Sequence, residues 1–148
     1  MDEALRAKIL DVLKSQNLMA LATVRPDGYP QATMVNYIHD DLILYFAADA
    51  VSQKAGNIKI NDKVSVAIAS EATDFRKLRG LSLAGLAKRV ADKQRAEELC
   101  LRLFRRLPQS RRFVPEDPDQ LAVFEIEPIA ISLVDYASGF GTSHLLEL

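Results

Sequence analysis

The chain has 148 residues and a mass of 16.4 kDa, the size of one domain, and we expect a single domain over residues 1–148. A formal net charge of −1 gives no reason to expect nucleic acid or a membrane surface as a partner. The single cysteine excludes an intrachain disulfide and a cysteine-based metal cluster, and the two histidines, which lack metal-ligand spacing, argue against a zinc site. With no signal-peptide pattern and no apolar run of about 20 residues, the sequence favours the cytoplasm.

The first third of the chain is expected to begin with a helix and to continue as short strands. Asp2 can cap the helix, whose apolar residues recur on one face at three- and four-residue steps: Leu5, Ile9, Val12 and Leu13. Turn residues at 25–28 and 39–41 separate three apolar segments at 18–24, 30–38 and 42–47. We expect these segments to form two consecutive hairpins, and hence a meander, with His39 in the exposed second turn.

The remaining elements alternate between strands and two further helices. Residues 51–60 and 92–107 have helical patterns, and the second helix is capped by Asp92 and stopped by Pro108. Strands are expected at 63–69, at 78–90 with a bend at its glycines, and at 121–127 and 129–134 on either side of Pro128. A loop over 109–120 and a tail from residue 135 complete the chain. The arginines between 102 and 112 are interpreted as a solvated face. Short antiparallel strands with a few helices indicate a barrel or a sandwich.

One turn carries a chemical signal. If Ser52 caps the second helix, Lys54 lies in its first turn, where a cation costs about 0.3–1 kcal/mol against the helix dipole. If an anion bound there, the lysine would become favourable, because the N–H groups, the hydroxyl and the ammonium group would all converge on the anion. The residues alone leave two interpretations open, namely a routine cap beside an exposed lysine or a phosphate site.

Short motifs along most of the chain favour the phosphate site. They are Arg25-Pro-Asp-Gly-Tyr-Pro30, Leu44-Tyr-Phe46, Ser52-Gln-Lys54, Asn57-Ile58, Gly85-Leu-Ala87, Phe124-Glu-Ile-Glu-Pro128 and Leu133-Val-Asp135. In this order and spacing, the sequence resembles the pyridoxamine 5′-phosphate oxidase-like, FMN-binding split-barrel family. The resemblance implies a mainly β (α+β) fold, a six- to seven-stranded antiparallel split β-barrel with covering helices. It also implies a homodimer with FMN in a groove between the subunits.

The same resemblance implies which residues hold the cofactor. The strand at 31–36 would line the flavin ring, residues 46–48 would lie beside the ribityl phosphate, and the turn at 52–54 would bind the phosphate. The cofactor-binding residues expected on this basis are Gln31, Thr33, Met34, Val35, Asn36, Phe46, Ala47, Ser52, Gln53 and Lys54.

The sequence also departs from the family pattern. Ala48 stands where the family commonly has a hydroxyl, and a common arginine is replaced around residues 31–32. Loss of these two partners is expected to weaken FMN binding by roughly tens- to hundreds-fold. The sequence contains no counterpart of the arginine-bearing C-terminal segment by which pyridoxamine 5′-phosphate oxidases hold their substrate. The resemblance therefore favours general stress flavoproteins or flavin reductases over vitamin B6 oxidation.

These observations predict an FMN-dependent oxidoreductase in which the flavin performs hydride transfer. No catalytic acid or base can be named from the sequence. Two alternatives stay open: a deazaflavin-dependent reductase, and a non-catalytic binding protein that handles flavin or haem.

Overall fold

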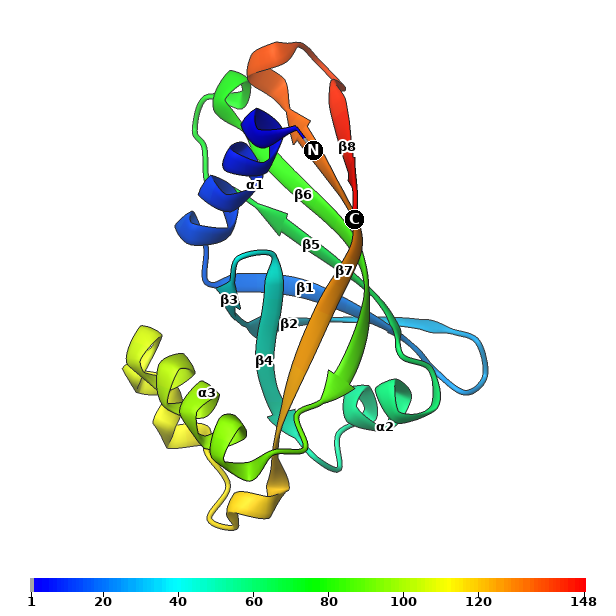
Figure 1. Cartoon of the computed structure of the whole chain (residues 1–148), viewed down its shortest axis with the longest axis vertical. Coiled ribbons are helices and arrows are strands. Elements are labelled where there is room, and N and C mark those ends of the chain that lie inside the picture. The colour runs from blue at the N-terminus through cyan, green and yellow to red at the C-terminus, as the bar shows by residue number, and fades with distance from the viewer. Residues whose placement is uncertain (1) are drawn as a thin grey trace.

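A strongly curled antiparallel sheet forms the centre of the protein (Figure 1). The structure is a computed structural model that describes residues 2–148, with only the main chain described for Phe113. The strands are β1 (Leu18–Val24), β2 (Pro30–Asn36), β3 (Ile38–Asp40), β4 (Ile43–Asp49), β5 (Lys63–Ala69), β6 (Arg79–Arg89), β7 (Leu121–Asp135) and β8 (Ser143–Glu147). Seven of them follow the order β2-β1-β5-β6-β7-β4-β3, and β8 pairs with β7. The prediction of a split β-barrel is confirmed, with β8 as an additional strand.

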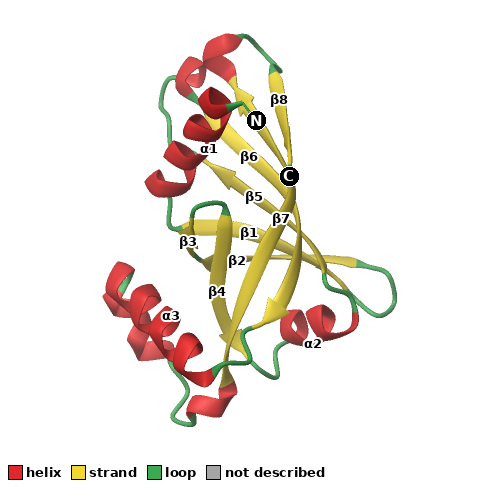
Figure 2. Cartoon of the chain, viewed as in Figure 1, coloured by secondary structure: helices red, strands yellow, loops and turns green. Residues whose placement is uncertain are grey.

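Three α-helices lie at the periphery of the strands (Figure 2). They are α1 (Glu3–Ser15), α2 (Gln53–Ile60) and α3 (Lys93–Arg106). Each begins at the predicted cap, because the side chains of Asp2, Ser52 and Asp92 accept hydrogen bonds from main-chain N–H groups of the first turn. Within residues 2–148, no helix is long and apolar enough to cross a membrane.

The core lies inside the curled sheet and beneath α1. Alternate residues of β5 are buried, as expected for strands with one face on the core. The rings of Phe46 on β4 and Phe124 on β7 stack with centroids 5.1 Å apart. All four apolar residues predicted for one face of α1 are buried, which confirms that interpretation.

The predicted meander is wrong, because the chain changes sheet edge at Tyr37. The two hairpins form, but β2 and β3 lie at opposite ends of the strand order. Tyr37 is 1% exposed, and its hydroxyl donates to the Leu13 carbonyl at 2.7 Å. Burial raises the pKa of Tyr37 to about 12. His39 lies in β3 rather than in the turn, which is formed by Asp41 and Leu42.

The strand break expected at Pro128 is also wrong, because β7 runs through it without interruption. Ala84 pairs with Ala130 and Gly85 pairs with Pro128, so Ile129 is an extra residue in a β-bulge. The bulge shifts the ladder at Pro128, which has no N–H to donate. Of the two glycines at which a bend or bulge is expected, Gly85 lies at this irregularity, whereas Gly80 pairs regularly with Ala69 and Val134.

Two segments expected to be irregular have local structure. The loop before β7 contains the 3-10 turns η2 (Pro108–Phe113) and η3 (Pro118–Gln120). The tail forms a further turn, η4 (Tyr136–Ser138), and then β8, which lies along the outer edge of the upper half of β7 (Figure 1).

Candidate functional site

A cavity lies at the split in the barrel, between β2 and the second half of β4. Among the described strands, β2 pairs only with β1, and residues 46–49 of β4 pair only with β7. The cavity has a volume of about 310 Å³. Its walls include Met34, Val35 and Asn36 from β2, Ala47, Ala48 and Asp49 from β4, and Leu103 and Phe104 from α3. The split therefore leaves two strand edges and an apolar wall facing one hollow.

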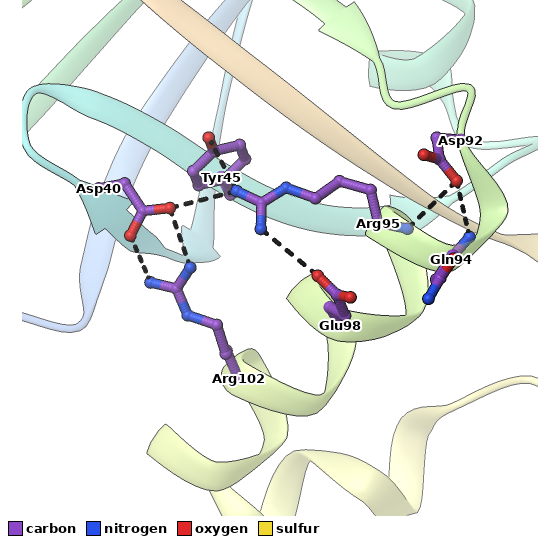
Figure 3. Close-up of polar contacts among 7 residues, drawn as sticks. All are labelled: Asp40, Tyr45, Asp92, Gln94, Arg95, Glu98 and Arg102. Atoms are coloured by element: carbon purple, nitrogen blue, oxygen red, sulfur yellow. Dashed lines mark hydrogen bonds and ion pairs between the residues drawn. The ribbon is translucent and has the colours of Figure 1, made fainter.

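An ion-pair network holds the α3 wall against the β3–β4 hairpin (Figure 3). The carboxylate of Asp40 binds the guanidinium groups of Arg102 and Arg95, at shortest distances of 2.8 and 3.3 Å. Arg95 also donates to the Tyr45 hydroxyl at 3.5 Å and pairs with Glu98 at 3.7 Å. The hydrogen bond from Arg102 lowers the pKa of Asp40, and Arg95 lowers it further. This network positions the helix that carries Leu103 and Phe104.

The helix start expected to bind phosphate lies directly beside the cavity. The Ser52 N–H donates to the carbonyl of Asp49, a cavity residue, at 3.0 Å. Ser52 caps α2, whose first turn contains no acidic residue. Lys54 is half-buried in that turn, and no ion pair between described residues involves it. N–H groups, a hydroxyl and an ammonium group are thus available to an anion.

A buried amide links Gln31 and Gln53, two of the expected site residues. Asn57 on α2 is 0% exposed, and its Oδ1 accepts from Gln53 Nε2 at 2.7 Å. Its Nδ2 donates to Thr23 Oγ1 at 3.0 Å and to Gln31 Oε1 at 3.3 Å. The sequence motifs included Asn57 but assigned it no role, and Thr23 was missed. A polar residue on the inner face of a short helix was the available signal.

Eight of the ten expected residues therefore form two groups in the structure, one lining the cavity and one around the start of α2. Met34, Val35, Asn36 and Ala47 line the cavity. Gln31 and Gln53 meet through Asn57, beside the helix start formed by Ser52 and Lys54.

Two expected residues join neither group. Thr33 is half-buried beside Leu21 of β1, and the side chain of Phe46 is 0% exposed in the core. Only the main chain of Phe46 can border a ligand in this structure.

Two features at the junction of the cavity and the helix start reduce the fit to a dianionic phosphate. Ala48 supplies no hydroxyl, and the cavity residue Asp49 carries a carboxylate that accepts from the Val51 N–H at 3.0 Å. Lys54 is the cation nearest in sequence to the cap. The residues at the start of α2 fit an anionic group, but the single ammonium group of Lys54 supplies less positive charge than two arginine side chains would.

Comparison with known proteins identifies relatives of this fold. The family model described as pyridoxamine 5′-phosphate oxidase matches residues 5–135. General Stress Protein 26 from Bacillus anthracis is 25% identical, with a TM-score of 0.74 over 97% of this chain and 98% of that chain.

Two more distant structures share the fold. An FAD-binding protein from Mesorhizobium loti is 19% identical, with a TM-score of 0.72 over 86% of this chain and 91% of that one. A haem-binding protein from Mycobacterium smegmatis is 19% identical, with a TM-score of 0.76 over 92% of this chain and 55% of that one. Among proteins with curated annotation, none matches the chain significantly. Because the family match spans well over half of the sequence, the chain belongs to the pyridoxamine 5′-phosphate oxidase family of split barrels.

Proposed function

We propose that this protein is an FMN-binding flavoprotein and an oxidoreductase, with the flavin held between two copies of the chain. One observation carries the proposal: the cavity at the barrel split adjoins the capped start of α2, through the hydrogen bond from Ser52 N–H to the Asp49 carbonyl. A hollow with an apolar wall next to the capped start of a helix suits a ring system that carries a phosphate.

Each part of the site would contribute separately to binding. The ring would lie in the cavity against the edges of β2 and β4, where main-chain groups without a ladder partner among the described strands can meet its polar atoms. The phosphate would lie at residues 52–54, where Lys54 supplies the positive charge. A bound flavin supplies hydride transfer, and the protein supplies position and electrostatics.

The size of the cavity supports a site completed by a second copy. A volume of about 310 Å³ is at the lower limit for a ligand pocket. One subunit would therefore form only part of a larger groove. The second copy of a homodimer would complete the groove, and the outer face of the sheet has a surface suited to it.

Two adjacent rows of mostly small, uncharged side chains cross that outer face in register over six strands. One row runs through Met34, Ala20, Ala67, Ser82, Ser132 and Leu145. The adjacent row runs through Ala32, Ala22, Ser65, Ala84, Ala130 and Glu147. Glu147 is the single charged member of the two rows. A face with so little charge is suited to close packing against an identical face.

The first test is the identity of the ligand in the purified protein. We expect the visible absorbance bands of an oxidised flavin, the mass of FMN after denaturation, and bleaching of the bands by NADH or NADPH. A flavin that neither nicotinamide reduces would support a carrier in place of an enzyme. Asp49 is the only ionisable side chain among the described cavity residues, which favours that second candidate. Haem or deazaflavin absorbance, or no uptake of added FMN, would overturn the FMN assignment.

A further inference from the structure

The buried amide of Asn57 couples the orientations of two glutamine side chains. Both hydrogens of its Nδ2 are used, on Thr23 Oγ1 at 3.0 Å and on Gln31 Oε1 at 3.3 Å. Its Oδ1 accepts from Gln53 Nε2 at 2.7 Å. Since Asn57 is 0% exposed, water does not substitute for any of these partners. Because the Asn57 nitrogen donates a hydrogen bond to Gln31, the Gln31 side chain must present its oxygen as the acceptor.

This arrangement decides which end of Gln31 is free. With Oε1 bound to Asn57, the NH₂ group of Gln31 remains available as a donor of two hydrogen bonds. If the nitrogen of Asn57 were replaced by an oxygen, Gln31 would have to turn its NH₂ group inward and leave its oxygen outward. An anion is bound by the first arrangement and repelled by the second.

We infer that Asn57 is a positioning residue that keeps the NH₂ group of Gln31 directed to the flavin phosphate. This inference rests on the proposed function, because the phosphate is its ligand. It assigns Asn57 an effect on phosphate recognition that operates through Gln31, without contact between Asn57 and the ligand. The neutral amide of Gln31 would thus replace part of the phosphate binding of the arginine that the family commonly has around residues 31–32.

The test compares FMN with riboflavin, which lacks the phosphate. Dissociation constants of both ligands are measured by quenching of flavin fluorescence, and the readout is the preference for FMN over riboflavin. Asn57→Asp keeps the shape of the side chain but offers only acceptors, so we expect at least a tenfold loss of that preference with riboflavin affinity nearly unchanged. Asn61→Asp is the matched control. It adds the same charge at the C-cap of α2 and keeps the acceptor for Lys63 N–H, so the preference should stay at its wild-type value.

A double-mutant cycle separates positioning from the direct effect of the added charge. Gln31→Leu removes the donor and is expected to reduce the preference for FMN by itself. In that background Asn57→Asp should have little further effect, because its route to the phosphate is gone. Equal losses from Asn57→Asp with and without Gln31 would overturn the positioning role, as would a Gln31→Leu variant with unchanged preference. The latter result is decisive even if Asn57→Asp does not fold.

Failure of the inference and failure of the proposed function give different results. If the wild-type protein binds neither FMN nor riboflavin, the proposed function is wrong, and the inference with it. If the wild-type protein prefers FMN and the effects of Gln31→Leu and Asn57→Asp on that preference simply add, only the role of Asn57 is rejected. Thermal unfolding followed by circular dichroism establishes that each compared variant is folded.

Discussion

The two carboxylate oxygens of Asp40 on β3 accept hydrogen bonds from the two terminal nitrogens of Arg102 on α3, at 3.0 and 2.8 Å. This fork-to-fork geometry is directional, and it fixes the helix against the β3–β4 hairpin. Leu103, the next residue of α3, is 8% exposed and lines the cavity. The shape of the cavity wall therefore depends on an ion pair that lies outside the cavity.

The Asp40→Asn variant is expected to lower the free energy of unfolding at neutral pH. Both side chains are partly exposed, at 46% and 36%, so solvent screening limits the loss to at most about 1 kcal/mol. Because Arg102 lowers the pKa of Asp40, the stabilisation is complete above the ordinary carboxyl pKa of about 3.9 and disappears as the pH falls through the lowered value. Thermal unfolding of both proteins at neutral and acidic pH should show the difference shrinking in acid. Asp27→Asn, in a local exposed pair with Arg25, should cost less at neutral pH.

The Lys54→Ala variant tests the phosphate assignment. Removal of the ammonium group from the first turn of α2 is expected to lower the affinity for FMN at least tenfold, since a charge-assisted hydrogen bond contributes about 1.5–3 kcal/mol. Riboflavin affinity should change little. Lys59→Ala, in the last turn of the same helix, is the matched control. Equal FMN affinity in wild type and Lys54→Ala would remove the phosphate from this turn.

The Gly85→Ala variant is expected to destabilise the fold. A Cβ at this position would lie 2.8 Å from both the Glu127 carbonyl oxygen and Ile126 Cγ2, at the point where the β6–β7 ladder shifts. Main-chain and core atoms cannot move apart cheaply, so we expect a loss of about 1–3 kcal/mol, measured by denaturant unfolding. At Gly80 on the same strand, the nearest atom to such a Cβ is 3.8 Å away. Gly80→Ala should therefore be tolerated, and a similar loss from both variants would contradict a specific contact at Gly85.

The Ala67→Arg variant tests the proposed dimer face. Ala67 is exposed at the centre of the first row of small side chains, between Ala20 and Ser82. A guanidinium group there would place a charge on the proposed contact face, so the variant is expected to be monomeric in light scattering after size-exclusion chromatography. Ala72→Arg, in an exposed loop away from the sheet, should leave the wild-type mass unchanged. A monomeric wild type, or a dimeric Ala67→Arg variant, would place the interface elsewhere.

The elements that sequence reasoning predicted correctly are those controlled by nearby residues. The caps Asp2, Ser52 and Asp92 and the apolar face of α1 depend on contacts within one or two turns. The strand at Pro128 was predicted wrongly because its continuity depends on the bulge opposite Gly85, which is a partner far away in the sequence. The meander failed for the same reason: Tyr37 is fixed by Leu13 and Asn17, and no local pattern reveals that contact.

The candidate site followed the same division. Ser52 and Lys54 could be recognised because the physics of a helix start is local. The pairing of Arg102 with Asp40 could not be recognised. The pattern of α3 predicts only a solvated face for its arginines, and Asp40 lies on a distant strand. The role of Asn57 depends on Thr23 and Gln31, which come from two other strands.

The position of β2 at the edge of the sheet has a consequence for solubility. A strand with one free side is a template for pairing with another chain, and its hydrogen-bonding groups favour aggregation when they are left uncovered. Here the edge begins with Pro30, which has no N–H to offer. The end of the edge, at Met34, Val35 and Asn36, lines the cavity. Whatever fills that cavity therefore also protects the protein, and expression without the ligand is expected to yield more aggregated material.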